Sequence, residues 1–268
     1  MNPLAWEERW PSMQRGVDVY LVCATRGEAG ETDEAHLKGV RNIAELREAE
    51  LRCAAAVLGL KEVFFLGYRD SGMPGAADNE HPEAQIRHPV EEVAARVVKY
   101  IRLLKPDVVS TFDPIGGYRH PDHIHIHKAT TLAFERANDP AFYPEAGAPF
   151  VPRALYYQTI SHRFLKVAVF LLRLFGKDPR HFGKNGDIDL VSLTEVEFPV
   201  HARIDIRPVW ARKEQASACH SSQGGRQMQG GVRGWVNRLF GGYETFMRAW
   251  PPVQPGEHVV TDLFEGIG

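Results

Sequence analysis

The stretch Gly116–His123 reads GGYRHPDH and directly follows an apolar run, Val108–Thr111 (VVST), with the composition of a buried strand. A helix-like segment, Ile124–Arg136, comes next. In an α/β fold this order places the polar residues at the carboxyl end of a strand and the amino end of a helix, where ligands bind. Because a neutral imidazole is a good zinc ligand, the stretch is a candidate metal or catalytic site. A surface loop that holds two histidines and an aspartate by chance is an equal alternative on composition alone.

Strand-like and helix-like patterns alternate on the amino-terminal side of this stretch. Apolar, β-rich runs predict strands at Val17–Cys23 and Val63–Leu66. Apolar residues at 3.6-residue spacing predict helices at Asn42–Leu58 and Pro89–Leu104. This alternation implies right-handed crossovers and therefore a parallel sheet.

The second half of the chain continues with strands and helices but has no repeat and no obvious linker. The predicted elements are strands at Arg153–Ile160 and Phe198–Ile206 and helices at Phe164–Phe175, Val209–His220 and Trp235–Trp250. Phe164–Phe175 is amphipathic. We favour a helix that packs on the domain or covers the site over one that contacts a membrane or an apolar substrate. We therefore expect a single domain over residues 1–268, with an atypical arm at 1–15 and a carboxyl-terminal extension at 224–268.

Composition excludes several classes of function. The chain has 268 residues, 44% hydrophobic and 25% charged, as in ordinary globular proteins. Its net charge of −2 gives no general attraction to nucleic acid. The longest apolar run, Val167–Leu172, is too short to be an integral membrane segment. No secretory signal is recognisable, and three isolated cysteines suit a reducing compartment, so a cytoplasmic location is expected; an oligomer is compatible with the sequence.

Two further strand-end loops carry polar residues. Gly67–Pro74 contains Asp70, and Ala24–Glu31 contains Arg26 and Glu28, for which a site role and a solvated ion pair are equally good interpretations. Arg47 and Glu50 stand at i and i+3 of a predicted helix, where a surface pair is a simple interpretation.

The histidines that follow the central stretch are harder to assign. His123 and His127 are spaced i and i+4, which can hold one metal ion on a helix face. For His127 alone, a solvated or packed helix histidine is the favoured reading.

Six motifs occur together along the chain. They are TRGEAGE (Thr25–Glu31), REAEL (Arg47–Leu51), LG (Leu58–Gly59), YRDSGM (Tyr68–Met73), GGYRHPDH (Gly116–His123) and HSSQ (His220–Gln223). In this order the chain resembles the LmbE-like, or PIG-L, zinc-dependent de-N-acetylases, which include the deacetylases and amidases of mycothiol and bacillithiol metabolism. The match runs from about residue 16 to about residue 223. It implies a Rossmann-like, three-layer α/β fold with helices on both faces of a parallel sheet, and hydrolysis of an acetamide or amide on an amino sugar.

The resemblance also implies roles for single residues. His123 matches the third zinc ligand of the family. His120 matches the histidine that stabilises the tetrahedral oxyanion or protonates the leaving amine, and Asp122 is expected to hold it. Tyr118 matches a mobile tyrosine near the carbonyl. Arg47 and Asp70 match sugar-binding positions.

One departure from the family pattern concerns the start of the fold. Family members have a first strand followed by an Ala-His-Pro-Asp-Asp-Glu motif, ahead of the strand that corresponds to Val17–Cys23. That motif supplies two zinc ligands, its His and its second Asp, and its first Asp is the general base. The printed sequence has no such string, so we expect the first strand to be missing and a sheet edge to be uncovered.

Two functions follow as expectations. The first is a zinc-dependent N-deacetylase or amidase that acts on an N-acetylglucosamine-type conjugate. The second is an inactive family member that serves as a sugar-binding or interaction protein, because half of the metal site is absent. Phosphate binding through Gly27–Gly30 is disfavoured, since that loop has neither GxGxxG nor the P-loop pattern.

Overall fold

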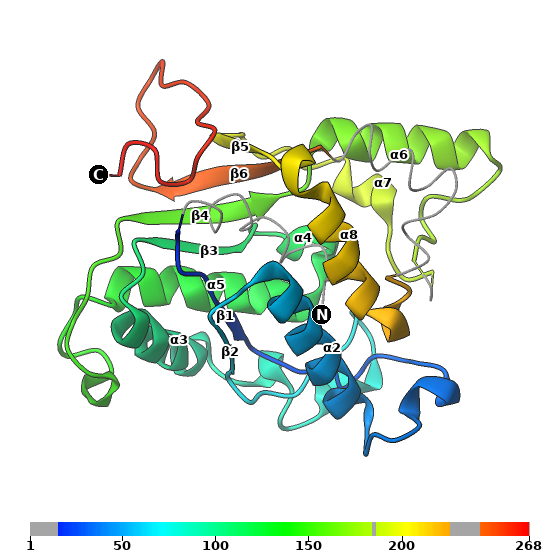
Figure 1. The fold of residues 1–268 in the computed structure, drawn as a ribbon, viewed down its shortest axis with the longest axis horizontal. Helices are drawn as coiled ribbons and strands as arrows, with labels where there is room; N and C mark the ends of the chain where they lie inside the picture. The colour runs from blue at the N-terminus through cyan, green and yellow to red at the C-terminus, as the bar shows by residue number, and fades with distance from the viewer. Residues whose placement is uncertain (1–15, 184–185, 226–241, 268) are drawn as a thin grey trace.

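The computed structural model describes residues 16–183, 186–225 and 242–267, and its centre is a set of strands in two adjoining sheets (Figure 1). The first sheet pairs β1 (Tyr20–Cys23) with β2 (Glu62–Phe65) in parallel. The second sheet has the order β3-β4-β6-β5. Its strands are β3 (Val108–Phe112), β4 (Ala154–Thr159), β6 (Tyr243–Trp250) and β5 (Ala202–Asp205).

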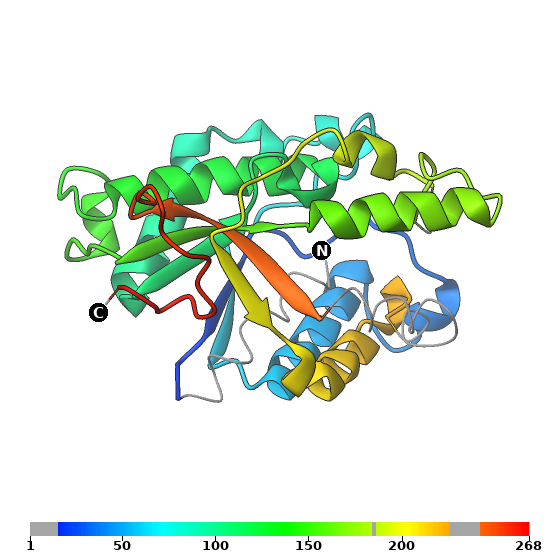
Figure 2. The ribbon, with the colours of Figure 1, turned by 90° about the horizontal axis from the view of Figure 1, so that it is seen from above.

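Helices cover both faces of these strands, as the predicted three-layer arrangement requires (Figure 2). The helix α3 (Val90–Leu104) packs against α5 (Pro121–Arg136) on one face. On the other face, α2 (Ile43–Leu58) packs against α8 (Trp210–Cys219). The shorter or peripheral helices are α4 (Gly116–Arg119), α6 (His162–Leu174) and α7 (Leu190–Leu193). The α/β class predicted from the sequence is therefore confirmed.

The helix predicted over Trp235–Trp250 is wrong. Residues 243–250 form β6, which runs antiparallel to both β4 and β5, and residues 235–241 lie outside the described part of the chain. Aromatic and β-branched residues such as Tyr243, Thr245 and Phe246 favour a strand, and Phe246 is fully buried between the neighbouring strands. The sheet is consequently mixed rather than purely parallel, and part of the predicted carboxyl-terminal extension lies inside it.

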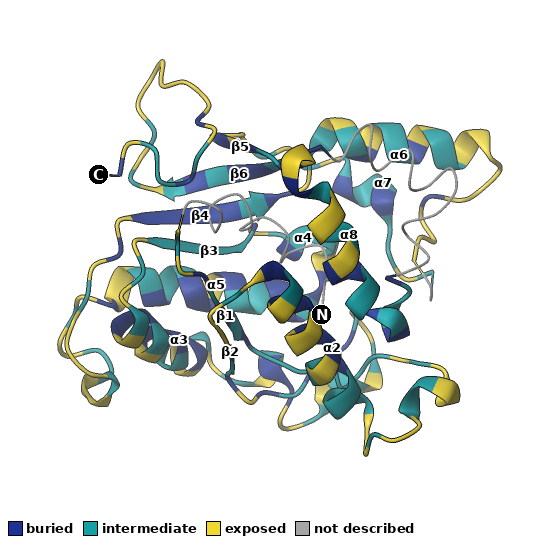
Figure 3. Ribbon diagram, in the orientation of Figure 1, coloured by how far each residue is buried: buried dark blue, intermediate teal, exposed yellow. Residues whose placement is uncertain are grey.

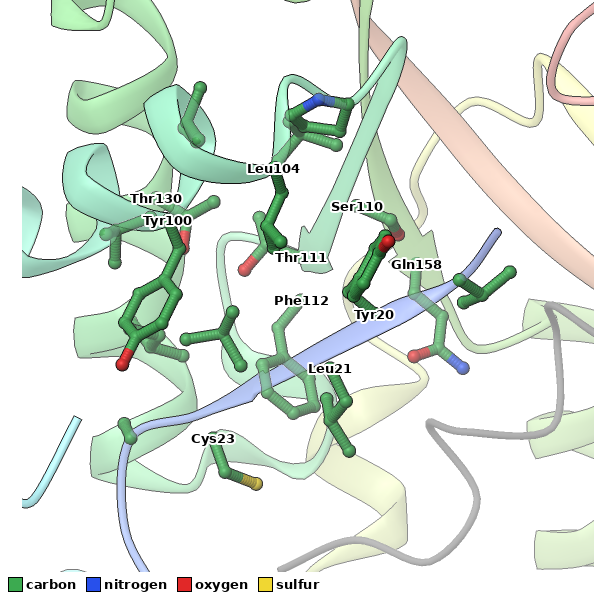
Figure 4. A pocket seen from close by; sticks show the side chains of 18 of the residues that line it. Tyr20, Leu21, Cys23, Tyr100, Leu104, Ser110, Thr111, Phe112, Thr130 and Gln158 are labelled. Carbon is green, nitrogen blue, oxygen red and sulfur yellow. The ribbon is translucent and has the colours of Figure 1, made fainter. Parts of the chain in front are cut away.

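The two sheets meet at β1 and β3, and a cavity of about 270 Å³ lies between these strands (Figure 4). Among the described residues, β1 pairs only with β2, and β3 pairs only with β4. The facing edges of β1 and β3 therefore form no ladder with each other or with another described strand, which is the arrangement expected where a strand is missing from a parallel sheet. The cavity runs toward the ends of these strands at which Asp70, His120, Asp122 and His123 lie.

A disulfide joins the two helices on the α2 side. Cys53 of α2 is bonded to Cys219 at the end of α8, across 166 residues of sequence, and Cys23 is a free, buried thiol. The cysteines are isolated in the sequence, and their spacing did not reveal this bond, because a separation of this length has no signature in the spacing. The bond fixes α8, and the turn that follows it, against α2.

The helix α6 has two different faces. Leu165 and Val169 are buried against Leu190 and Leu193 of α7, so the predicted packing of this helix on the domain is confirmed for that face. The opposite face is exposed (Figure 3). No helix in the described ranges is long and apolar enough to cross a membrane.

Candidate active site

The GGYRHPDH stretch forms a tight turn at the end of β3. The carboxylate of Asp113 accepts hydrogen bonds from the backbone N–H groups of Ile115 (3.0 Å) and Gly117 (2.9 Å). The helix α5 then begins at Pro121, earlier than the predicted Ile124. It begins there because the imidazole of His120 acts as the cap and accepts a hydrogen bond from the backbone N–H of Asp122.

Gly116 lies where no side chain fits. Its φ is +68°, and a Cβ atom would come within 2.8 Å of the backbone nitrogen of Ile124 and 2.9 Å of Cβ of His123. Gly117 also has a positive φ, +67°, with ψ of −86°, but a Cβ there would meet only Ile160, at 4.0 Å. The first glycine is required by close packing and conformation together, and the second by conformation alone.

Alanine at these two positions is expected to separate the two effects. Gly117→Ala should lower the free energy of unfolding by about 1–3 kcal/mol, the cost of a residue held in a sparsely populated backbone region. Gly116→Ala should cost about 1–3 kcal/mol more, because the start of α5 must shift to relieve overpacking. Chemical denaturation of both variants measures the difference, and equal losses would contradict the packing argument.

His123 is held in the tautomer that leaves a nitrogen free for a metal. Its Nδ1 lies 3.2 Å from the carbonyl oxygen of Gly116, which can only accept, so Nδ1 carries the hydrogen and Nε2 keeps its lone pair. Burial lowers the pKa of His123 well below its usual range. The ring stacks on Phe112 with centroids 3.9 Å apart. A neutral, oriented imidazole whose other nitrogen bonds a backbone carbonyl is the form in which histidine binds zinc.

His120 is held in the opposite tautomer. Its Nδ1 accepts from the backbone N–H of Asp122 at 3.2 Å, so the neutral ring carries its hydrogen on Nε2. That Nε2 lies 3.9 Å from a carboxylate oxygen of Asp70. Burial lowers the pKa of His120 to about 4, although the charge of Asp70 opposes this shift. The His120 ring is therefore neutral at pH 7, and its Nε2–H is a hydrogen-bond donor. The neighbouring His123 ring has a lone pair on its Nε2 instead.

Asp122 differs from the expectation in how it contacts His120. Only its backbone holds the imidazole, because its carboxylate accepts hydrogen bonds from the backbone N–H (2.9 Å) and the hydroxyl of Ser71. Burial, and then the charge of Asp70, raise the pKa of Asp122 to about 7. Burial alone would also raise the pKa of Asp70, but His120 and the backbone N–H of Gly72 lower it instead. A proton taken up by this carboxylate pair near neutral pH therefore resides on Asp122.

The donor atoms at this site suit zinc. In the described part of the chain, one group of three has ligand atoms within 4.8 Å of one another: Asp70, His120 and Asp122. The tautomer of His120 argues against its serving as a ligand, whereas His123 lines the same cavity with Nε2 available. His123 is not in that group, so in this structure its Nε2 does not lie within 4.8 Å of both carboxylates. An imidazole nitrogen and carboxylate oxygens are nevertheless the types of ligand that zinc accepts. Zinc, the metal expected from the resemblance, fits the residues present.

Arg47 lies under the first strand-end loop. Its guanidinium is buried and donates to the carbonyl oxygen of Gly27 at 2.9 Å, and a Cβ atom on Gly30 would overlap it. The prediction of a surface pair between Arg47 and Glu50 is wrong, because both side chains are buried and bond elsewhere. The charges of Asp70 and Glu50 favour the protonated guanidinium, although burial, the larger effect, lowers the pKa of Arg47.

Glu50 explains the HSSQ motif. Its carboxylate accepts from the hydroxyl of Ser221 (3.1 Å), from the backbone N–H (2.7 Å) and hydroxyl (2.8 Å) of Ser222, and from the amide of Gln223 (3.4 Å). The turn after α8 is thus attached to α2 one turn away from the disulfide. These four hydrogen bonds offset the cost of burying the carboxylate.

Glu50→Ala is expected to lower the free energy of unfolding by about 3 kcal/mol, because the buried donors of the HSSQ turn lose their common acceptor. Glu48 lies on the same helix and makes partly exposed ion pairs with Arg26 and Arg52. Glu48→Ala, the matched control, should cost at most about 1 kcal/mol. Equal losses, measured by denaturant titration, would show that the Glu50 contacts contribute no more than a surface pair.

Glu28 organises the loop that carries Asp70. It accepts from the backbone N–H groups of Asp70 (3.0 Å) and Arg26 (3.2 Å), while Nε of Arg26 pairs with Glu48 at 2.9 Å. The proposed ion pair between the side chains of Arg26 and Glu28 is therefore wrong. Glu28 instead fixes Asp70 across 42 residues of sequence.

Comparison with known proteins identifies the family. A family profile described as PIG-L, GlcNAc-PI de-N-acetylase, matches residues 12–134. A 1D-myo-inositol 2-acetamido-2-deoxy-alpha-D-glucopyranoside deacetylase from Streptomyces avermitilis is 36% identical over 264 residues, which cover 94% of this chain and 88% of that protein. A protein of the same name from Thermobifida fusca is 35% identical over 217 residues, or 78% of this chain and 74% of that one. The chain belongs to the PIG-L family.

Solved structures support the fold of this PIG-L protein. The N,N'-diacetylchitobiose deacetylase of Pyrococcus horikoshii superposes with a TM-score of 0.61 and 19% identity, over 92% of this chain and 78% of the other. A zinc-inhibited form of teicoplanin deacetylase has a TM-score of 0.52 and 17% identity, with 92% and 93% covered. A 4-carboxy-2-hydroxymuconate hydratase from Pseudomonas putida is similar at 0.52 and 19%, with 92% and 90% covered. Since these neighbours differ in activity, likeness at this level shows the fold alone.

The site of this PIG-L protein brings together residues that are far apart in sequence. Asp70, His120, Asp122 and His123 line one cavity, and Tyr118 lies against both imidazoles, with ring centroids 5.9 Å from His120 and 5.1 Å from His123. Arg47 does not line that cavity but lies close enough to Asp70 and Tyr118 for their charges to act on it.

Four further residues hold the site in place without lining its centre: His127, which the sequence analysis considered, and three residues that it missed. His127 bonds the carbonyl oxygen of Phe112 at 2.8 Å and packs edge-on against Tyr157, the packed-helix alternative. Sequence reasoning missed Glu28 as a support for Asp70, Ser71 as a partner of Asp122, and Asp113 as the residue that holds the turn. Asp113 stands ahead of Pro114 and two glycines, a turn signal that could have revealed it.

Proposed function

We propose that this chain is a zinc-dependent N-deacetylase that hydrolyses the acetamide of an N-acetylglucosamine-type amino-sugar conjugate, a small molecule. The observation that carries the proposal is the pair of adjacent, buried imidazoles in opposite tautomers, one with a free lone pair and one with a free N–H. Amide hydrolysis needs both a metal ligand and a donor for the developing oxyanion. The named relatives deacetylate a 2-acetamido-2-deoxy sugar joined to inositol, which supports this substrate class.

Each predicted residue has a role in this mechanism. Zinc held by His123 would supply positive charge that acidifies a water and polarises the amide carbonyl. The Nε2–H of His120 would donate to the carbonyl oxygen as it gains negative charge, and the backbone of Asp122 orients that ring. Tyr118 would close over the acetyl group. Asp70 lines the cavity and would contact the metal or a sugar hydroxyl, whereas Arg47 does not line it and would act by supporting the loop at Gly27.

The proton of the attacking water needs an acceptor. The printed sequence contains no counterpart of the family's His-Pro-Asp-Asp motif, whose first Asp is the base. General base catalysis is worth roughly 10²- to 10⁴-fold, so this chain alone is expected to turn over slowly. The same absence favours the second candidate, an inactive sugar-binding or interaction protein.

One experiment distinguishes the two functions. The chain is incubated with zinc and an N-acetylglucosaminyl inositol, and acetate release is measured, while sugar binding is measured separately with a chelator present. Zinc-dependent acetate release that the chelator abolishes would support the deacetylase. Saturable binding that survives the chelator, without any acetate release, would establish the binding protein.

The cytoplasm is the proposed location, and the Cys53–Cys219 bond provides its test. Disulfides are rare in reducing compartments, so a cytoplasmic location requires that the Cys53–Cys219 bond of this structure be open in the cell, with both cysteines present as thiols. Recovery of the disulfide after rapid alkylation of intact cells would instead place the protein in an oxidising compartment.

A further inference from the structure

The exposed face of α6 carries large apolar side chains that the fold does not use. Phe170, Leu174 and Phe175 are 64%, 66% and 65% exposed, although the opposite face of the helix is anchored by Leu165 and Val169. Scattered exposed leucines are ordinary, but three neighbouring large side chains on one helix end form a patch. Figure 2 shows α6 extending along one end of the molecule.

Cations surround the same patch. Arg163, Lys166, Arg173 and Lys177 are all exposed, and none of them has an ion pair with another described residue. No acidic residue occurs from 162 to 177. Positions 163, 166, 170, 173 and 174 fall on one side of a helix, because they are separated by multiples of three and four residues. We call these four cations and three apolar residues the α6 outer face.

We propose that the α6 outer face is a docking surface for an anionic lipid bilayer. Lysine and arginine beside exposed phenylalanine and leucine are the pattern of helices that lie in the membrane interface, with the cations at anionic headgroups and the apolar side chains below them. The net charge of the whole chain is −2, so the attraction comes from this face and not from the protein as a whole.

Other occupants fit this face less well. A second copy related by a two-fold axis would oppose the same cations across the interface, which is unfavourable. A nucleic acid would pair with the cations but would leave the apolar side chains without a partner. An anionic bilayer offers a partner to both kinds of side chain, because its headgroups can pair with the cations and its acyl chains can contact the apolar side chains.

Docking would bring the candidate active site to the membrane. Ile115 and Tyr118 pack against the core cluster beneath α6, so the helix lies next to the GGYRHPDH turn. The proposal rests on α6 alone and holds whether or not the chain is a deacetylase.

The test uses the full chain and two kinds of vesicle: phosphatidylcholine alone, and phosphatidylcholine mixed with phosphatidylglycerol. Co-sedimentation is expected with the anionic vesicles only, and it should weaken as salt is raised. Each cation near an anionic surface contributes roughly fivefold to partitioning, so Lys166→Glu with Arg173→Glu should reduce binding by at least about 20-fold. Phe170→Ser with Leu174→Ser should reduce it comparably, by removing the inserted side chains.

The matched control lies on α3, where Leu103 is 61% exposed between exposed Lys99 and Lys105. Leu103→Ser with Lys99→Glu is expected to leave vesicle binding unchanged. Equal binding to both kinds of vesicle, no binding, or equal effects of the α3 and α6 changes would overturn the proposal. So would a dimer in lipid-free sedimentation that Phe170→Ser abolishes, since that result would assign the face to a second copy.

Discussion

His123→Ala is expected to abolish stoichiometric zinc binding and, with it, any turnover. In this structure His123 is the imidazole in the cavity whose orientation leaves Nε2 free, since His120 uses Nδ1 as an acceptor and presents a hydrogen on Nε2. Without that nitrogen, only carboxylates remain to hold the ion, and oxygen ligands alone suit magnesium or calcium better than zinc. Elemental mass spectrometry after dialysis measures the metal directly.

The matched control is His127→Ala, one helical turn further along α5. His127 shares the i, i+4 face with His123, but its Nδ1 bonds Phe112 and its ring packs on Tyr157. Zinc should therefore be retained in His127→Ala. Zinc that persists in His123→Ala, or that disappears equally in both variants, would refute the assignment.

A chain extended by an added strand and a His-Pro-Asp-Asp motif provides a third test, in which turnover is measured. Among the described strands, none pairs with the edges of β1 and β3 that face the cavity, so a parallel strand placed there would end beside Asp70 and His123. Turnover is expected to rise by roughly 10²- to 10⁴-fold, the contribution of a general base. If His123→Ala kept full activity in this extended chain, the zinc mechanism would be wrong.

The elements that the sequence predicted correctly were those with strong local patterns. The apolar stripe of α3 and the β-rich run of β3 needed no tertiary information, because the buried faces repeat at the period of the element. The segment Trp235–Trp250 failed because aromatic residues at mixed spacing fit either state, and the pairing of β6 between β4 and β5 decided the outcome. The pairing of β6 with β4 and β5 involves residues far away in the chain, so it cannot be predicted from the local sequence.

The part of the candidate site that is continuous in the sequence could be predicted, and the part that comes from distant segments could not. GGYRHPDH is continuous in the sequence, so its polar residues can be recognised together as a candidate site. Their supports come from elsewhere: Glu28 fixes the backbone of Asp70, Ser71 binds Asp122, and the HSSQ turn surrounds Glu50. The predicted pairing of Arg47 with Glu50 followed the helical spacing rule, which assumes a surface position, whereas the structure buries both residues. Burial on a particular helix face depends on α8 and the first loop, which no local window includes.

His120→Gln is expected to lower kcat by roughly 10²- to 10³-fold, the loss typical for removal of one oxyanion donor, while zinc content stays unchanged. The effect should fall on kcat rather than KM, because the Nε2–H would strengthen its hydrogen bond only as charge develops on the carbonyl oxygen. Steady-state kinetics and metal analysis of the same preparation separate this outcome from a structural loss of the site. Zinc lost along with activity would make His120 a ligand and reverse the roles of the two histidines.

The pH dependence gives an independent check of the same role. Because the pKa of His120 is lowered to about 4, its ring is neutral throughout the range from pH 5 to pH 8 and donates equally well across it. The ratio of wild-type to His120→Gln activity should therefore be constant over that range, and it should change only as the pH approaches 4, where Nδ1 gains a proton and can no longer accept from the backbone N–H of Asp122. A ratio that instead changes tenfold per pH unit near pH 6.5 would mean that His120 titrates like an exposed histidine and acts by transferring its proton.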